Sequence, residues 1–266
     1  MKTINYTLGF LGLVAGSLAF TNSAAAFNFT TNFTTNPSLT GNQRWQGDIY
    51  LDSVQYGSTS VNQFALVNRV NILSNDLWTG GNTGAASADK GDLATVGLSQ
   101  ERLTADGAVA ALGNRYLSSI IDTEDSGSFA MNLFFDKAVD NLFFFERGRN
   151  SKLDVQAIDA SGNLIGNLLA LDSGKNAPDW QSAGYQLNTL EIGDFQTVGS
   201  RGVSIADLGV TGPISGIRVF SRGSAYQGPD FKVVGSVASV PEPGTIVGLG
   251  IVTAGFMASR RRHKNG

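Results

Sequence analysis

The sequence predicts an all-β protein whose body is a β-sandwich, jelly-roll-like in its connections. Short apolar and β-branched runs recur about every ten residues, which is typical of strands in a sandwich or barrel. Turns rich in Gly, Asn and Asp separate these runs, and the chain contains 33 Gly in 266 residues. No segment repeats at the fixed period of roughly 20 to 50 residues that marks a solenoid or propeller. The body is therefore expected to be one domain.

The first 26 residues have the composition of a secretory signal peptide. Lys2 precedes an apolar stretch over residues 8–20, and the segment ends in three alanines at residues 24–26. A basic start, an apolar centre and small residues before the cleavage site are what signal peptidase requires. We expect cleavage after Ala26, which leaves Phe27 as the mature N-terminus. The alternative is a buried N-terminal helix.

The C-terminal residues carry a second membrane signal. Pro241, Glu242 and Pro243 precede an apolar segment over residues 245–259, and a basic cluster follows at residues 260–264. The apolar segment is shorter than the roughly 20 residues that cross a bilayer comfortably. Basic residues directly behind it favour a stop-transfer segment, because they stay on the cytoplasmic side. We therefore divide the chain into a signal peptide (1–26), a β-sandwich body (27–238) and a sorting signal (239–266).

The first half of the body is expected to contain three extended segments. These are an arm over residues 27–38, a strand with a bulge within residues 45–56, and a strand over residues 64–73. Residues 79–92 contain so much Gly, Asn, Asp and Ser that they predict a loop. Good helix formers within residues 99–121, interrupted by Gly107 and Gly113, predict one or two short helices inserted near residues 100–120.

The second half carries stronger strand patterns. Residues 128–135 alternate in polarity, residues 136–140 predict a turn, and residues 141–146 are apolar on both faces, as expected of a strand buried on two sides. Strands over residues 153–158 and 164–171, joined by a hairpin turn, would complete a β-meander. The remaining predicted strands are residues 183–190, 202–208, 214–221 and 231–237.

Composition excludes several classes of function. The chain has no Cys, and its single His, His263, lies behind the sorting signal. A Ser-His-Asp triad, a Cys-His pair and a Cys/His zinc site therefore lack their residues. Residues 27–240 contain 14 Lys and Arg against 21 Asp and Glu, a net charge of −7. An acidic domain repels phosphate backbones, so nucleic acid is not an expected partner.

Hydrolysis of glycosides by paired carboxyl groups remains chemically available. It needs one carboxyl group kept protonated by an apolar setting. Glu146 is the best single candidate, because it ends an apolar strand and its pKa should be raised there. A structural ion pair with Arg147, Arg149 or Arg218 is the interpretation we favour. We predict no catalytic residue and no enzyme activity.

Oxygen-rich loops make Ca²⁺ the one cofactor to consider, although none is predicted. Residues 122–125 and residues 172–179 each place several carboxyl and amide groups close together. Ordinary turns use the same residues. Aromatic side chains offer a further possibility, since exposed rings stack on sugars, but packing in the core is the favoured interpretation. The aromatic residues in question are Trp45, Trp78, Trp180, Tyr50, Tyr56, Tyr185 and Tyr226.

The C-terminal pattern resembles the PEP-CTERM sorting signal. The resemblance rests on Pro241, Glu242 and Pro243, the short apolar segment and the basic end. It implies recognition by a membrane-embedded exosortase and removal of the tail. Residues 139–163 and 228–234 also resemble cyanobacterial exosortase-dependent surface proteins, a family from which no catalytic or binding residue carries over.

Together these observations predict an exported, exosortase-processed protein of the cell surface or extracellular matrix, with a non-catalytic β-sandwich. The expected partners are signal peptidase and exosortase during export, with extracellular polysaccharide as a further candidate. Two alternatives stay open. One is a carbohydrate-binding module for exopolysaccharide, and the other is a glycoside hydrolase or lyase that uses only Asp and Glu.

Overall fold

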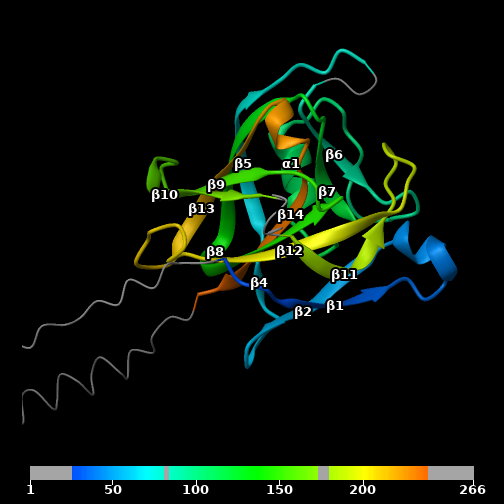
Figure 1. Cartoon of the computed structure of the whole chain (residues 1–266), viewed down its shortest axis with the longest axis horizontal. Coiled ribbons are helices and arrows are strands. Elements are labelled where there is room, and N and C mark those ends of the chain that lie inside the picture. The colour runs from blue at the N-terminus through cyan, green and yellow to red at the C-terminus, as the bar shows by residue number, and fades with distance from the viewer. Residues whose placement is uncertain (1–25, 81–83, 173–179, 239–266) are drawn as a thin grey trace, which may run out of the picture.

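The computed structural model describes residues 26–80, 84–172 and 180–238, and it confirms the all-β prediction (Figure 1). One α-helix, α1 (Ala105–Leu112), and two short 3-10 helices, η1 (Gly41–Trp45) and η2 (Ser224–Tyr226), lie within this part of the chain. The strands are β1 (Thr30–Thr35), β2 (Ile49–Tyr56), β3 (Thr59–Val61), β4 (Phe64–Ala65), β5 (Val67–Asn75), β6 (Ala86–Lys90), β7 (Ser119–Thr123), β8 (Ser128–Arg147), β9 (Leu153–Ile158), β10 (Leu164–Leu171), β11 (Gln181–Leu187), β12 (Gln196–Ser204), β13 (Ile214–Arg222) and β14 (Asp230–Val237).

Strand β8 organises the larger sheet. Its first half pairs with β5 and β13, and its second half pairs with β12 and β14. The turn predicted over residues 136–140 is wrong, because the chain runs through them as one strand of 20 residues. The ladders with β13 and β14 both shift register next to Val139. A bulged strand bends without reversing, so the exposed Asp136 and Lys137 mark a bend.

The predicted β-meander is also wrong. Strands β9 and β10 form the expected hairpin, but β13 lies between β9 and β8 in the sheet. Alternation of polarity identifies a strand and its buried face, not its neighbour. The strand predicted over residues 214–221 is confirmed as β13, and its Ile217 and Val219 are buried in the core.

Two hydrophobic cores lie on opposite sides of β8, as its apolar sequence predicts. Leu142 and Phe144 belong to one core, and Phe143 and Phe145 belong to the other. The small sheet of β1, β2 and β3 covers the second core, with Phe29 packed edge-to-face on Phe143 at 5.1 Å between ring centroids. In Figure 1 this sheet, in blue, lies along one side of the molecule. The result is a sandwich of two sheets.

The predicted loop over residues 79–92 contains strand β6, which corrects the prediction. Strand β6 pairs with β7 along its whole length, and Ala86, Ala88 and Asp89 are buried. Small side chains carry little strand propensity of their own, so tertiary pairing decides the structure here. This strand places Asp89 inside the protein.

Helix α1 is shorter than the predicted helical stretch, whose end forms part of β7. The Thr104 hydroxyl caps the helix by accepting a hydrogen bond from the Gly107 N–H at 3.0 Å. At the other end, the buried Lys232 Nζ donates to the Ala111 carbonyl at 2.6 Å.

Two predictions for the first half of the body are confirmed. The strand predicted over residues 64–73 is divided between β4 and β5. The bulge expected within residues 45–56 lies in β2, where its pairing with β1 shifts register.

Candidate functional site

An acidic pocket of about 290 Å³ lies where the ends of several strands meet. The loop after β7 supplies most of one wall, and β8, the β11–β12 loop and the start of β14 supply the others. The residues that line it are Asp122, Thr123, Glu124, Asp125, Ser126, Arg147, Asn150, Glu191, Ile192, Gln196, Gln227, Gly228 and Asp230. Carboxyl groups therefore dominate its charged lining.

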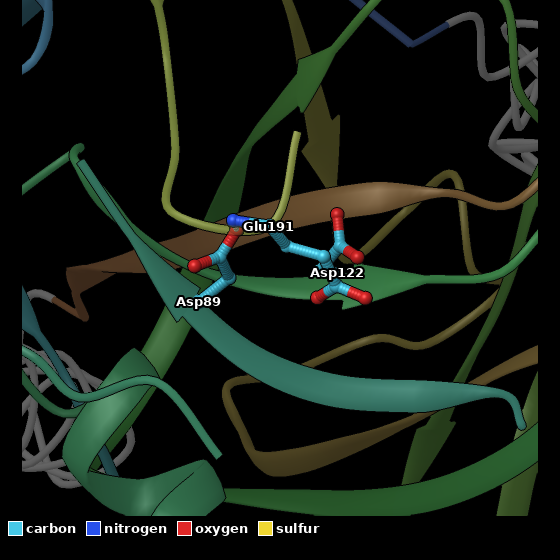
Figure 2. A group of neighbouring side chains, drawn as sticks. All are labelled: Asp89, Asp122 and Glu191. Atoms are coloured by element: carbon cyan, nitrogen blue, oxygen red, sulfur yellow. Dashed lines mark hydrogen bonds between the residues drawn. The ribbon is translucent and has the colours of Figure 1, made fainter. Parts of the chain in front are cut away.

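Asp89, Asp122 and Glu191 form a compact carboxylate cluster, which we call the acidic triad. One carboxylate oxygen of each residue lies within 4.8 Å of those of the other two (Figure 2). Asp122 stands opposite Ser87 in the β6–β7 ladder, so Asp89, two residues further along β6, shares its face. Glu191 reaches the same face from the loop after β11, and its backbone N–H donates to Asp89 Oδ2 at 3.3 Å.

Asp122 is a deeply buried carboxyl group in the lining of the pocket. Only 3% of the residue is exposed, and no hydrogen-bond donor within the described residues reaches its Oδ1. Burial raises the pKa of Asp122 well above its ordinary value, and the neighbouring Asp230 raises it further. Burial likewise raises the pKa of Glu191 to about 8, with Asp122 as the next cause.

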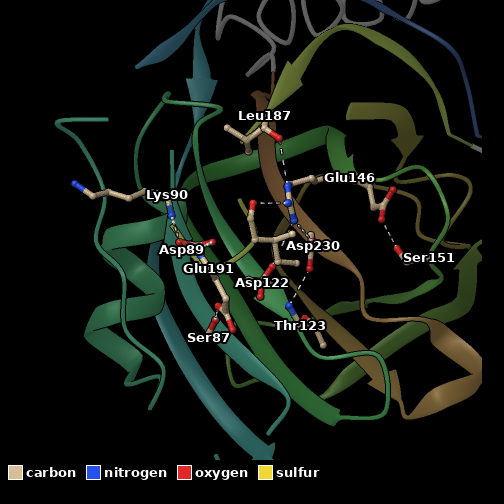
Figure 3. Close-up of polar contacts among 12 residues, drawn as sticks. Ser87, Asp89, Lys90, Asp122, Thr123, Glu146, Ser151, Leu187, Glu191 and Asp230 are labelled. Carbon is tan, nitrogen blue, oxygen red and sulfur yellow. Dashed lines mark hydrogen bonds and ion pairs between the residues drawn. The ribbon is translucent and has the colours of Figure 1, made fainter. Parts of the chain in front are cut away.

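Arg147 brings one positive charge to this region. Its Nη1 lies 3.0 Å from Asp230 Oδ2 and 3.9 Å from Asp122 Oδ1. The guanidinium also donates to the backbone carbonyls of Leu187 and Ile192. Asp230 Oδ1 accepts a further hydrogen bond from the Thr123 N–H at 2.9 Å (Figure 3). Burial nevertheless raises the pKa of Asp230 to about 7, because the desolvation cost exceeds the attraction to Arg147.

The balance of charge leaves the triad short of cations. Lys90 follows Asp89 directly, but its side chain points away from the triad and its Nζ donates to the Ala94 carbonyl at 2.7 Å (Figure 3). Among the residues that the structure describes, four carboxyl groups, those of the triad and Asp230, therefore face the one guanidinium of Arg147. Such a site has two chemical uses: it holds protons for acid–base chemistry, or it binds a hard cation.

Glu146 has the raised pKa that its sequence position predicts, but it lies away from the pocket lining. Burial raises its pKa to about 8, and its Oε1 accepts a hydrogen bond from the Ser151 hydroxyl at 2.5 Å. The favoured ion pair with an arginine is wrong. Successive residues of a strand point to opposite faces, so Arg147 turns toward Asp230 instead. Arg149 donates to the Trp180 carbonyl, and Arg218 donates to Asn132 and Gly162.

The two candidate calcium loops have different outcomes. Residues 122–125 line the pocket. The other two carboxylates of the cluster around Asp122, however, belong to Asp89 and Glu191, which lie in distant segments of the chain. Of the second loop, residues 173–179 lie outside the described part of the chain. Sequence reasoning missed Asp89 and Glu191 because the pairing of β6 with β7, which creates the cluster, has no local signal.

Most of the aromatic residues pack inside the protein, as the favoured interpretation holds. Trp45, Trp180, Tyr185 and Tyr226 are buried, and Trp180 Nε1 donates to the Ser151 carbonyl at 2.9 Å. Trp78 is partly exposed beside Arg102, whose guanidinium carbon lies 5.5 Å from the ring centroid. These side chains do not form one exposed platform for a sugar.

The predicted processing sites lie at the two ends of the described body. Ala26 packs partly against the larger core, and Phe27 exchanges two backbone hydrogen bonds of 2.8 Å with Gly202. Cleavage after Ala26 stays a prediction. Pro241, Glu242 and Pro243 lie outside the described residues. Within those residues, no helix has the length and apolar character needed to cross a membrane.

Comparison with known proteins identifies the C-terminal signal. The family model for the PEP-CTERM protein-sorting motif matches residues 239–262. No curated protein and no solved structure matches the chain. The chain thus carries the sorting signal of an exosortase-processed protein that is exported to the cell surface.

Proposed function

We propose that this protein works at the cell surface or in the extracellular matrix as a non-catalytic β-sandwich, after signal peptidase and exosortase have processed its ends. The observation that carries the proposal is the PEP-CTERM motif at residues 239–262. A second support is composition, because the body contains neither Cys nor His. Most nucleophilic and imidazole-based catalysts therefore have no counterpart in it.

The sorting motif follows the folded body almost directly. Strand β14 ends at Val237, and the Ala238 N–H donates to the Ala138 carbonyl at 2.9 Å. Pro241 is only three residues beyond Ala238. Since β14 pairs with the central strand β8, the fold holds the chain firmly up to the motif. We infer that exosortase acts with the folded body close to its membrane-embedded site.

The resemblance to cyanobacterial exosortase-dependent surface proteins supports the same role. It covers residues 139–163 and 228–234, which contribute to β8, β9 and β14. Strands β8 and β14 pair directly, so part of the resemblance lies in the middle of the larger sheet. Extracellular polysaccharide is the partner that we propose for the exported body.

Fractionation of the host cell tests the proposal. A double variant, Pro241→Ala with Pro243→Ala, should accumulate with its tail attached, while the wild type should appear at the surface without the tail. Pro213→Ala, which changes a proline of the body, is the matched control and should be processed normally. Wild-type protein that keeps an intact tail and stays in the cytoplasm would overturn the proposal.

A glycoside hydrolase or lyase is the second candidate, and the acidic pocket is what favours it. Glu124 and Glu191 both line the pocket. Burial, followed by the charge of Glu191, raises the pKa of Glu124 to about 7. Burial, followed by the charge of Asp122, raises the pKa of Glu191 to about 8. A carboxyl group that remains protonated near neutral pH is a suitable general acid. Glycosidases pair such an acid with a second carboxylate.

Release of new sugar ends from neutral and acidic polysaccharides decides between the two candidates. Turnover by the wild type that falls at least 100-fold in Glu191→Gln would support the hydrolase or lyase and overturn the non-catalytic role. Absence of product from every polysaccharide would remove the second candidate. Asp125→Asn, an exposed change at the same pocket, controls for general effects of altered charge.

A further inference from the structure

We propose that Asp89, Asp122 and Glu191 bind one Ca²⁺ ion beside the acidic pocket, whose lining includes Asp122 and Glu191. The inference concerns a site that the sorting signal does not involve, and it holds whether or not the body is catalytic. The three ligands come from β6, β7 and the β11–β12 loop, so a bound ion would tie together segments that are far apart in the sequence.

The spacing of the carboxylate oxygens fits Ca²⁺. Ca²⁺ takes oxygen ligands at about 2.3–2.6 Å, so two ligands on opposite sides of the ion stand about 4.6–5.2 Å apart. The three oxygens of the triad lie within 4.8 Å of one another, so small side-chain adjustments would let one Ca²⁺ contact all three. Mg²⁺ holds its ligands at about 2.0–2.1 Å and requires a tighter, near-octahedral arrangement. Mg²⁺ usually keeps several waters and is bound by only one or two protein carboxylates, so a set of three carboxylates suits Ca²⁺ better.

A second observation also points to a missing partner. Asp122 is 97% buried, since 3% of its surface is exposed, and its Oδ1 receives no hydrogen bond from the described residues. An unpaired carboxylate is costly to bury unless it is protonated, ion-paired or bound to a metal. Arg147 stands 3.9 Å from this oxygen and makes its closer ion pair, at 3.0 Å, with Asp230. A cation between the carboxylates would give Asp122 Oδ1 a closer partner than Arg147.

The surrounding charges also favour a cation. Asp230 on β14, Glu124 in the loop after β7 and Glu101 before α1 add negative charge around the triad, as their mutual effects on pKa show. Arg147 opposes them with one positive charge. A pocket with low-dielectric walls and an excess of carboxylates concentrates cations. The cavity of about 290 Å³ beside Asp122 and Glu191 leaves room for the water molecules that would complete the coordination of Ca²⁺.

Proton sharing is the competing explanation of the triad. Carboxyl groups with raised pKa values hold protons, which removes the need for a metal. The two explanations differ in one respect: a bound Ca²⁺ must displace those protons, so its affinity should rise as the pH rises. Protonated carboxyl groups without metal affinity would show no response to Ca²⁺ at any pH.

Calorimetric titration of the full chain with CaCl₂, after removal of metals with EDTA, tests the site. We expect one Ca²⁺ per chain with a Kd in the range of extracellular modules, about 10⁻⁴ to 10⁻³ M. Asp122→Asn and Glu191→Gln should each weaken binding at least tenfold, and MgCl₂ should bind at least tenfold more weakly than CaCl₂. Asp125→Asn is the matched control, because Asp125 lines the pocket but is exposed and lies outside the triad. Its Kd should stay much closer to that of the wild type than the Kd of either triad variant does.

Thermal unfolding keeps the test decisive if a variant folds poorly. CaCl₂ should raise the Tm of the wild type and of Asp125→Asn by several degrees, because a ligand that binds only the native state stabilises it. It should leave the Tm of Glu191→Gln, a change at a partly exposed loop position, unaltered. No saturable binding to the wild type, or equal Ca²⁺ binding by the wild type and both triad variants, would overturn the proposal.

Discussion

Arg147 and Asp230 are direct partners across the β8–β14 ladder, and the Arg147 guanidinium lies 3.0 Å from the Asp230 carboxylate. Both residues are buried. The pair therefore joins two central strands at the base of the acidic pocket. Since Arg147 is the guanidinium that faces the pocket's carboxyl groups, it controls both the stability of this region and its electrostatic potential.

Removal of that guanidinium should be costly. We expect Arg147→Met to lower the free energy of unfolding by about 3–5 kcal/mol, because it leaves buried carboxyl groups without their ion-pair partner. Urea denaturation of both proteins at pH 7 measures the loss. Arg222→Met is the matched control. Its guanidinium also lies 3.0 Å from a carboxylate, that of Asp154, but 58% of the Arg222 side chain is exposed. Equal losses in the two variants would contradict the role given to Arg147.

The pH dependence of stability should change when Glu146 is replaced. Burial raises the pKa of Glu146 to about 8 in the folded state, against 4.5 for an ordinary Glu. Between these values the folded state binds more protons than the unfolded state, so the contribution of Glu146 falls as pH rises. We expect Glu146→Gln to gain stability relative to the wild type between pH 5 and pH 8, by on the order of a few kcal/mol. Urea midpoints at intervals of one pH unit would show it, and a constant difference would argue against the raised pKa.

Trp180 should behave as a core residue. It is fully buried and its indole N–H donates to the Ser151 carbonyl at 2.9 Å. We expect Trp180→Ala to cost about 3–5 kcal/mol, as large-to-small changes of buried aromatic residues do. Trp78→Ala, at a partly exposed position, should cost clearly less. Denaturant unfolding measures both, and a small loss for Trp180→Ala would place this side chain outside the core.

The lack of a side chain at Gly202 should allow Phe27 of the N-terminal arm to pack against this residue. A Cβ atom at residue 202 would overlap the Phe27 ring, whereas one at Gly212 would meet nothing within 4 Å. We expect Gly202→Ala to displace Phe27 and to cost about 1–3 kcal/mol, in the manner of an overpacked site. Gly212→Ala is the control. Limited proteolysis should release the arm of the first variant faster, and equal rates would show that Phe27 does not depend on Gly202.

The sequence predicts the strands well where side-chain polarity alternates, as in β13, and where a strand is apolar on both faces, as in residues 141–146. It fails where pairing decides the structure. Strand β6 is built from small and polar residues, and its buried position follows from its pairing with β7. The same pairing brings Asp89 beside Asp122. A triad assembled from residues 89, 122 and 191 therefore has no signature in local spacing.

The bend in β8 is a second feature that the sequence alone does not predict. Asp136 and Asp140 are common turn residues, and they predicted a turn that the structure does not contain. The ladder with β13 and β14 shifts register at this point instead. Whether polar residues reverse a chain or only bend it depends on the partner strands, which lie far away in the sequence.

The intact mass of the protein recovered from the cell surface tests export and processing most directly. We predict a chain that begins at Phe27 and lacks residues from the C-terminal sorting signal at 239–266. Surface protein of the full 28.0 kDa, retaining Met1 and Gly266, would contradict the proposed processing.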